Sequence, residues 1–135
     1  RLNDSMGDYV ASQIIKTMIK KNIKVNGAQI LMLGITFKEN CPDVRNTKIV
    51  DVVKSLEEYS TKVTIYDPWA NSDEVKHEYG LTCHATLDSD IKYDAIVLGV
   101  AHNEFKILDL ASLKKENAVV YDVKGVLGSL ADAKL

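Results

Sequence analysis

The sequence predicts an α/β fold, an open, doubly wound and mostly parallel sheet preceded by one additional helix. Short apolar runs, each about the length of a strand, alternate with segments of helical periodicity. The runs are apolar at almost every position, as in parallel strands that helices cover on both faces. Because strand–helix–strand connections are right-handed, such alternating elements close into one parallel sheet.

Four buried strands and one edge strand follow from these runs. Each main run is rich in Ile, Val and Leu and ends at a glycine, proline or polar residue. The four strands are expected at Ala28–Ile35, Lys62–Pro68, Tyr93–Val100 and Ala118–Asp122, and Leu81–His84 can add a short edge strand.

Helices are expected before, between and after these strands. The first, Asn3–Lys21, carries Val10, Ile14 and Met18 at four-residue spacing. This apolar stripe can cover the domain's own sheet or pack against a second copy of the chain. The remaining helices are expected at Thr47–Tyr59, Asp73–Tyr79 and around Asn103–Lys115.

Composition excludes several classes of protein. The 135 residues hold 17 basic and 19 acidic side chains, for a net charge of -2, which argues against a nucleic-acid partner. No apolar run is long enough to span a membrane, and the first residues lack the apolar core of a signal peptide. Two cysteines are too few for a disulfide framework or a zinc knuckle. We expect a cytoplasmic globular domain with no bound metal.

The segment after the first strand, Gly34–Thr47, is the first candidate site, because parallel sheets bind ligands beyond the carboxyl ends of their strands. It lacks the G-x-G-x-x-G dinucleotide fingerprint. Lys38 and Arg45 nevertheless lie near a predicted helix N-terminus, where anions bind, and Phe37 offers a flat face for a base or sugar. Alternatively, both cations are solvated loop charges and Phe37 belongs to the core.

The turn after the last strand adds a further cation, Lys124, which can also be an ordinary surface lysine. Since Lys38, Arg45 and Lys124 come from separate loops at one sheet edge, we expect them to converge beside Phe37 on a pyrophosphate.

Four other residues near strand ends are candidates, and two of them, Asp67 and His102, have two interpretations each. Asp67, before Pro68, can hold a ribose hydroxyl or form a turn, and Trp69 can pack against another domain. His102 can face a ligand or fill polar space, and Asn103 is expected to cap the following helix.

Cys41 lies in the first loop and would need a neighbouring base or cation to act as a nucleophile. Arg45 could be that cation, but no histidine stands nearby in the sequence, so a catalytic role for Cys41 is not expected.

Several motifs in order resemble one family. Gly34-x-x-Phe37-Lys38-(x)4-Asp43-x-Arg45-x-Thr47 is similar to the motif that opens the C-terminal, UDP-binding domain of the UDP-glucose/GDP-mannose dehydrogenase family. Val63–Pro68 continues the likeness, and Arg1–Val10 resembles the end of the helix that links the family's two Rossmann-like domains. Phe37–Asp43 and Tyr121–Leu127 look most like bacterial UDP-N-acetylhexosamine 6-dehydrogenases.

The resemblance implies an NAD-dependent oxidoreductase that oxidises C6 of a UDP-N-acetylhexosamine to a carboxylate, for capsule or lipopolysaccharide synthesis. It divides the chain into residues 1–26, the end of the linking helix, and residues 27–135, a UDP-sugar-binding Rossmann-like domain. The family's chemistry uses a cysteine nucleophile in a glycine-rich motif, which these 135 residues lack, and Cys41 does not match it. No catalytic residue is therefore expected here, and the chain alone is expected to be inactive.

The resemblance also assigns binding roles and partners. Phe37, Lys38 and Lys124 would bind the UDP-sugar, and Arg45 would reach the NAD pyrophosphate. NAD would be held mainly by an N-terminal domain outside this sequence, and the full-length enzyme would be a homodimer. The alternatives are the C-terminal domain of a UDP-glucose or GDP-mannose 6-dehydrogenase, or a non-enzymatic receiver-type module. The receiver alternative is weakened because Gly34-Ile35-Thr36 follows the first strand where a receiver needs acidic residues.

Overall fold

The computed structural model describes residues 2–135, with side chains from Met6 onward. The helices are α1 Leu2–Lys20, α2 Ile49–Glu57, α3 Ser72–Tyr79 and α4 Asn103–Lys106, with 3-10 turns at Leu110–Ser112 and Gly128–Leu130. The strands are β1 Gln29–Leu33, β2 Lys62–Tyr66, β3 Cys83–His84, β4 Tyr93–Leu98, β5 Lys114–Asp122 and β6 Ala133–Lys134.

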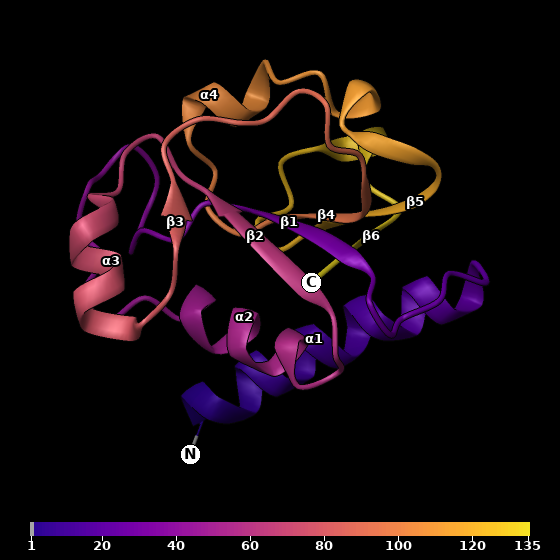
Figure 1. Ribbon diagram of the computed structural model, residues 1–135, viewed down its shortest axis with the longest axis horizontal. Coiled ribbons are helices and arrows are strands. Elements are labelled where there is room, and N and C mark those ends of the chain that lie inside the picture. Colours follow the sequence, from indigo (N-terminus) through magenta and orange to yellow (C-terminus); the bar gives the residue numbers. More distant parts are fainter. Residues whose placement is uncertain (1) are drawn as a thin grey trace.

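The six strands form one sheet in the order β3-β2-β1-β4-β5-β6, and every neighbouring pair is parallel (Figure 1). The chain moves outward from β1 to one edge, returns to β4 beside β1, and then moves to the other edge. This order is that of doubly wound dinucleotide-binding folds. The predicted fold class is confirmed.

The central strand β1 shows how the sheet is covered on both faces. Ile30 and Met32 pack into the core that α1, α2 and α3 share, whereas Leu31 and Leu33 pack with Phe105 of α4. Figure 1 shows α1 and α2 together on one side of the sheet and α4 on the other. Alternating side chains of one strand thus fill two cores, which explains why its sequence is apolar throughout.

The apolar stripe of α1 covers this domain's own fold. The stripe is buried in the core on the α1 and α2 side of the sheet, where α1 packs on α2 and β5; its residues are Val10, Ile14 and Met18. At Gly7 the two helices approach closely, because an added Cβ would lie 2.6 Å from Cβ of Asp51. These three side chains are therefore not available to a second copy of the chain.

The prediction of a helix around Asn103–Lys115 is correct only for its first turn and wrong for the rest. α4 ends at Lys106, Leu110–Ser112 forms a 3-10 turn, and β5 already begins at Lys114. Leu110 and Leu113 are buried against the sheet, and this packing overrides the helical propensity of the tract. Asn103 is not the cap of α4: the N-cap residue is His102.

Candidate nucleotide site

The candidate site lies where the order of the strands reverses, between β1 and β4. Gly34 follows β1 with φ +94°, and a Cβ on it would lie 2.6 Å from Cβ of Val100 in the turn after β4. The N–H groups of Gly99 and Val100 both donate to the carbonyl of Leu33, at 2.9 and 3.1 Å. The turns after β1 and β4 are therefore in close contact at the place where doubly wound sheets bind ligands.

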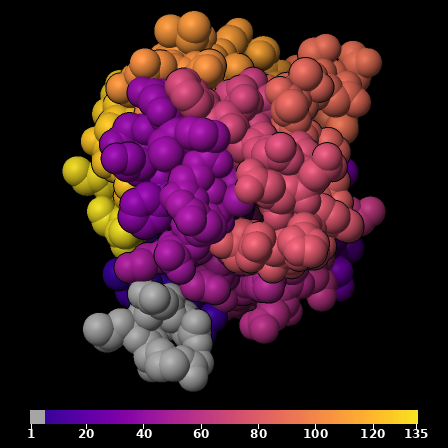
Figure 2. Space-filling view, turned by 90° about the vertical axis from the view of Figure 1, so that its left-hand side faces the viewer, coloured from indigo at the N-terminus to yellow at the C-terminus, as the bar shows by residue number. Residues whose placement is uncertain are grey.

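A cavity of about 300 Å³ opens beside these turns. Phe37 from the loop after β1 and Lys124 from the loop after β5 both line it, and Phe37 is 56% exposed. Figure 2 shows the purple loop after β1 at the surface, beside the yellow C-terminal segment. The remaining lining residues are Met6, Val10, Thr36, Asn46, Thr47, Lys48, Ile49, Val52, Gly99, Val100, Val123 and Leu135.

The loop that carries Lys124 is built on one buried carboxylate. Asp122, at the end of β5, accepts hydrogen bonds from the N–H groups of Lys124 at 2.9 Å and Gly125 at 2.8 Å through Oδ1. Its Oδ2 accepts the N–H of Leu127 at 2.7 Å. Three bonds to one side chain fix the path of the turn, so Lys124 stands at the cavity on a well-defined backbone.

Arg45 lies in a neighbouring hollow rather than in the cavity. Its Nε and Nη2 donate to the two carboxylate oxygens of Asp43, at 3.0 and 3.2 Å. These hydrogen bonds lower the pKa of Asp43 and raise that of Arg45. The Arg45 side chain is 78% exposed, and it shares its hollow with Lys48, which also lines the cavity.

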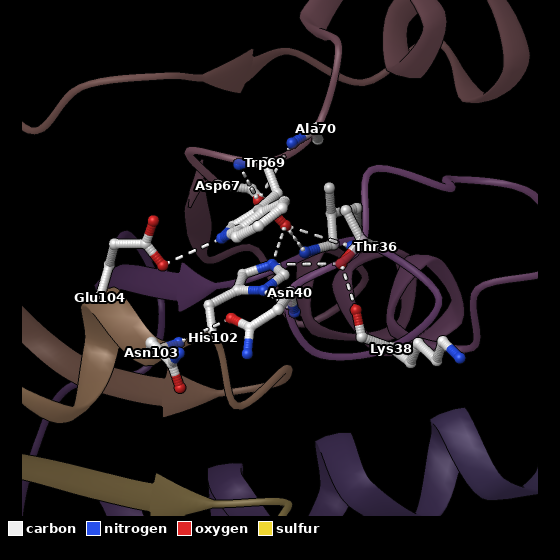
Figure 3. Close-up of polar contacts among 10 residues, drawn as sticks. Thr36, Lys38, Asn40, Asp67, Trp69, Ala70, His102, Asn103 and Glu104 are labelled. Atoms are coloured by element: carbon white, nitrogen blue, oxygen red, sulfur yellow. Dashed lines mark hydrogen bonds and ion pairs between the residues drawn. The ribbon is translucent and has the colours of Figure 1, made fainter.

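Lys38 lines neither hollow, and Figure 3 shows its exposed side chain extending away from His102 and Asp67. The expectation of one shared hollow for all three cations therefore needs correction. The structure brings Phe37 and Lys124 together, places Arg45 next to them, and leaves Lys38 at the outer edge of the loop.

Asp67 and His102 form a buried pair beside this loop. Both side chains are fully buried, and Nε2 of His102 lies 3.0 Å from Oδ2 of Asp67. Oδ1 of Asp67 accepts the N–H groups of Trp69 at 2.8 Å and Ala70 at 3.2 Å, which makes it a turn-forming residue. A ribose hydroxyl cannot reach a carboxylate enclosed in this way.

Hydrogen bonds stabilise the ionised carboxylate of Asp67. Burial raises the pKa of this carboxyl, but the bonds from His102 and from the N–H groups of Ile35 and Trp69 outweigh it and leave the pKa below its usual value. Sequence reasoning missed the pair, although Asp67 directly follows β2 and His102 lies in the short connection between β4 and α4, both at the ligand-binding edge.

The two free cysteines lie in different surroundings. Cys41 is partly exposed in the loop after β1, and Cys83 is buried in β3, where burial raises the pKa of its thiol to about 12. Among the side chains described, from Met6 onward, no group of three or more His, Cys, Asp or Glu is placed to hold a metal ion. No described helix is both long and apolar enough to cross a bilayer.

Comparison with known proteins identifies the family of the chain. The family model for the UDP-glucose/GDP-mannose dehydrogenase family, UDP binding domain, matches residues 31–129. The UDP-N-acetyl-D-glucosamine 6-dehydrogenase of Salmonella typhi is 52% identical over 94% of this chain, and that of Pseudomonas aeruginosa is 50% identical over 94%. The chain spans 30% and 31% of the length of these two relatives.

Solved structures agree on the fold. The NDP-N-acetyl-D-galactosaminuronic acid dehydrogenase of Methanosarcina mazei superposes on 88% of this chain, and the chain covers 25% of it, with a TM-score of 0.76 at 22% identity. The UDP-N-acetyl-mannosamine dehydrogenase Cap5O of S. aureus superposes on 93% of this chain, and the chain covers 28% of it, with a TM-score of 0.70 at 25% identity.

The strand order defines a doubly wound, Rossmann-like α/β domain with a cavity at its switch point. The family match is specific: the chain belongs to the UDP-glucose/GDP-mannose dehydrogenase family and corresponds to its UDP binding domain.

Proposed function

We propose that the cavity between the loops after β1, β4 and β5 binds the nucleotide part of a UDP-sugar. The observation that carries the proposal is that Phe37 and Lys124, from loops far apart in the sequence, line the same cavity. An aromatic ring can stack on uracil, and an ammonium group attracts a diphosphate as a point charge. Lys38, on the outer edge of the loop, can reach the part of the ligand that projects from the cavity.

Arg45 is proposed to contact the pyrophosphate of NAD. A guanidinium has five N–H donors, and Asp43 engages only two of them. The outer edge of the group therefore stays available to phosphate, and Asp43 holds it in a fixed orientation. The turn after β1 has one glycine and no dinucleotide fingerprint, so the rest of an NAD site would come from residues outside this sequence.

The whole protein is proposed to be an NAD-dependent dehydrogenase that oxidises C6 of a UDP-N-acetylhexosamine. The two relatives at 52% and 50% identity, both called UDP-N-acetyl-D-glucosamine 6-dehydrogenases, support this substrate class. NAD would supply the oxidant, bound mainly by an N-terminal domain. The product would serve capsule or lipopolysaccharide synthesis in the cytoplasm, a reducing compartment that suits two free cysteines.

Residues 1–26 are proposed to be the end of the linking helix and residues 27–135 the UDP-sugar-binding domain. We propose that a homodimer of the full-length protein uses the outward face of α1, where Tyr9 and Ile19 are exposed. Light scattering on the full-length protein tests this, and a monomer at high concentration would contradict it.

Isothermal titration calorimetry of this chain with UDP tests the binding proposal. We expect saturable binding of UDP and UDP-N-acetylglucosamine, and weaker binding of UMP, which lacks the second phosphate. No saturation at millimolar UDP would contradict the proposal. The chain alone should not reduce NAD in the presence of a UDP-N-acetylhexosamine, and any turnover would contradict the assignment of the nucleophile to another domain.

A further inference from the structure

The buried imidazole of His102 is bound on both of its nitrogens. The N–H of Asn40 lies 2.9 Å from Nδ1, and Nε2 lies 3.0 Å from Asp67 Oδ2 and 3.1 Å from Thr36 Oγ1 (Figure 3). A backbone N–H can only donate, so Nδ1 must be the unprotonated nitrogen. His102 is therefore neutral, with its hydrogen on Nε2.

The hydroxyl of Thr36 is consistent with this tautomer. Thr36 Oγ1 donates its own hydrogen to the carbonyl of Lys38, 3.0 Å away, so it can only accept from Nε2 of His102. The Nε2 hydrogen is thus shared between the carboxylate of Asp67 and this hydroxyl. With this tautomer, the Nε2 hydrogen of His102, the hydroxyl of Thr36 and the backbone N–H of Asn40 each face an acceptor.

His102 holds the loop after β1 at two points, Thr36 and Asn40, and these points flank Phe37 and Lys38. Asn40 returns the contact, because its Oδ1 accepts the N–H of Asn103 at 3.0 Å. The loop is therefore hydrogen-bonded to the start of α4 through both His102 and Asn103.

Trp69 covers the imidazole. Its indole ring stacks on His102 with ring centroids 5.9 Å apart and planes at 24°, and its Nε1 donates to Glu104 at 2.9 Å. Water is thereby kept from the His102 hydrogen bonds, which are stronger in a dry environment.

We propose that His102 is a positioning residue for nucleotide binding: its neutral imidazole fixes the loop that presents Phe37 and Lys38 to the UDP-sugar. This inference rests on the proposed function of the cavity. His102 lies outside the cavity lining and would not touch the ligand. Its effect would pass through the bonds to Thr36 and Asn40.

Two substitutions at His102 test the hydrogen bonds of its two nitrogens separately. His102→Asn keeps an acceptor near the position of Nδ1 but cannot reach Asp67, and His102→Gln keeps a donor near Nε2 but offers Asn40 no acceptor. We expect each to raise the dissociation constant for UDP about fivefold to tenfold, the effect of one lost buried hydrogen bond. Amide exchange at Asn40 should accelerate most in His102→Gln.

Leu113→Ala is the matched control, because Leu113 is buried on the α4 side of the sheet and lies outside the cavity lining. It should lower stability and leave the dissociation constant for UDP unchanged. If both His102 variants bind UDP as tightly as the wild type, His102 has no positioning role. If the wild type itself does not bind UDP, the proposed function fails and this role fails with it. Imidazole ¹⁵N shifts that show a proton on Nδ1 would also overturn the inference.

Discussion

Asp67 and Asp122 occupy equivalent positions at the carboxyl ends of β2 and β5, on opposite sides of the switch point. Each is buried, and each accepts the N–H groups of the residues two and three positions later through Oδ1. Each also uses Oδ2 for a longer connection, Asp67 to His102 and Asp122 to Leu127. Two buried carboxylates thus set the turns on both sides of the candidate site.

The conformation of the turn that carries Lys124 should depend on the ionised carboxylate of Asp122. In Asp122→Asn an amide NH₂ must replace one acceptor oxygen, and it would face a backbone N–H donor. We expect the free energy of unfolding to fall by about 1–3 kcal/mol and UDP binding to weaken. Urea denaturation measures the first effect, and Glu116→Gln, at an exposed position of β5, should change neither.

The stabilisation from Asp67 should depend on pH. Because the pKa of Asp67 is lowered in the folded state from 3.8, its contribution is complete above that value and is lost as the pH falls through the folded pKa. Asp67→Asn should be less stable than the wild type by about 2–3 kcal/mol at pH 7. The gap should stay constant down to about pH 5 and narrow below about pH 4. A gap that widens under acid conditions would contradict the account.

Gly34 should be the least replaceable glycine of the site. Gly34→Ala places a Cβ 2.6 Å from Val100 Cβ at a positive φ, so we expect a loss of at least about 2 kcal/mol of unfolding free energy. Gly27→Ala is the matched control, because Gly27 also has a positive φ but has no atom within 4 Å of the added Cβ. Its cost should be about 1 kcal/mol. Equal losses would show that Val100 can move away.

Lys124 should contribute to UDP affinity through its charge. Lys124→Ala should weaken UDP binding about tenfold at low ionic strength and less at high salt. Lys124→Arg should bind at least as well as the wild type, since a guanidinium can engage two phosphate oxygens. Lys16→Ala, at an exposed position of α1, controls for loss of net charge. Calorimetry at two salt concentrations distinguishes these outcomes.

The main strands could be predicted because their apolar runs, such as Ile30–Leu33, report burial on two faces. The tract after α4 could not, because its helical propensity gives way to the burial of Leu110 and Leu113 against the sheet. β6, of two residues, is too short to leave a pattern.

The candidate site could also be predicted only in part from the sequence. Strand ends indicated Phe37 and Lys124, since topology alone brings those loops to one edge. The pairing of Asp67 with His102 joins residues 35 positions apart. Only the packed structure reveals which polar groups face each other.

Amide chemical-shift mapping of this chain during UDP titration tests the central claim most directly. We predict that the largest shifts fall on Phe37, Gly99 and Lys124, around the cavity, and that Phe37→Ala reduces them. Shifts concentrated instead on Tyr9 and Tyr59, in the open groove between α1 and α2, would contradict the account.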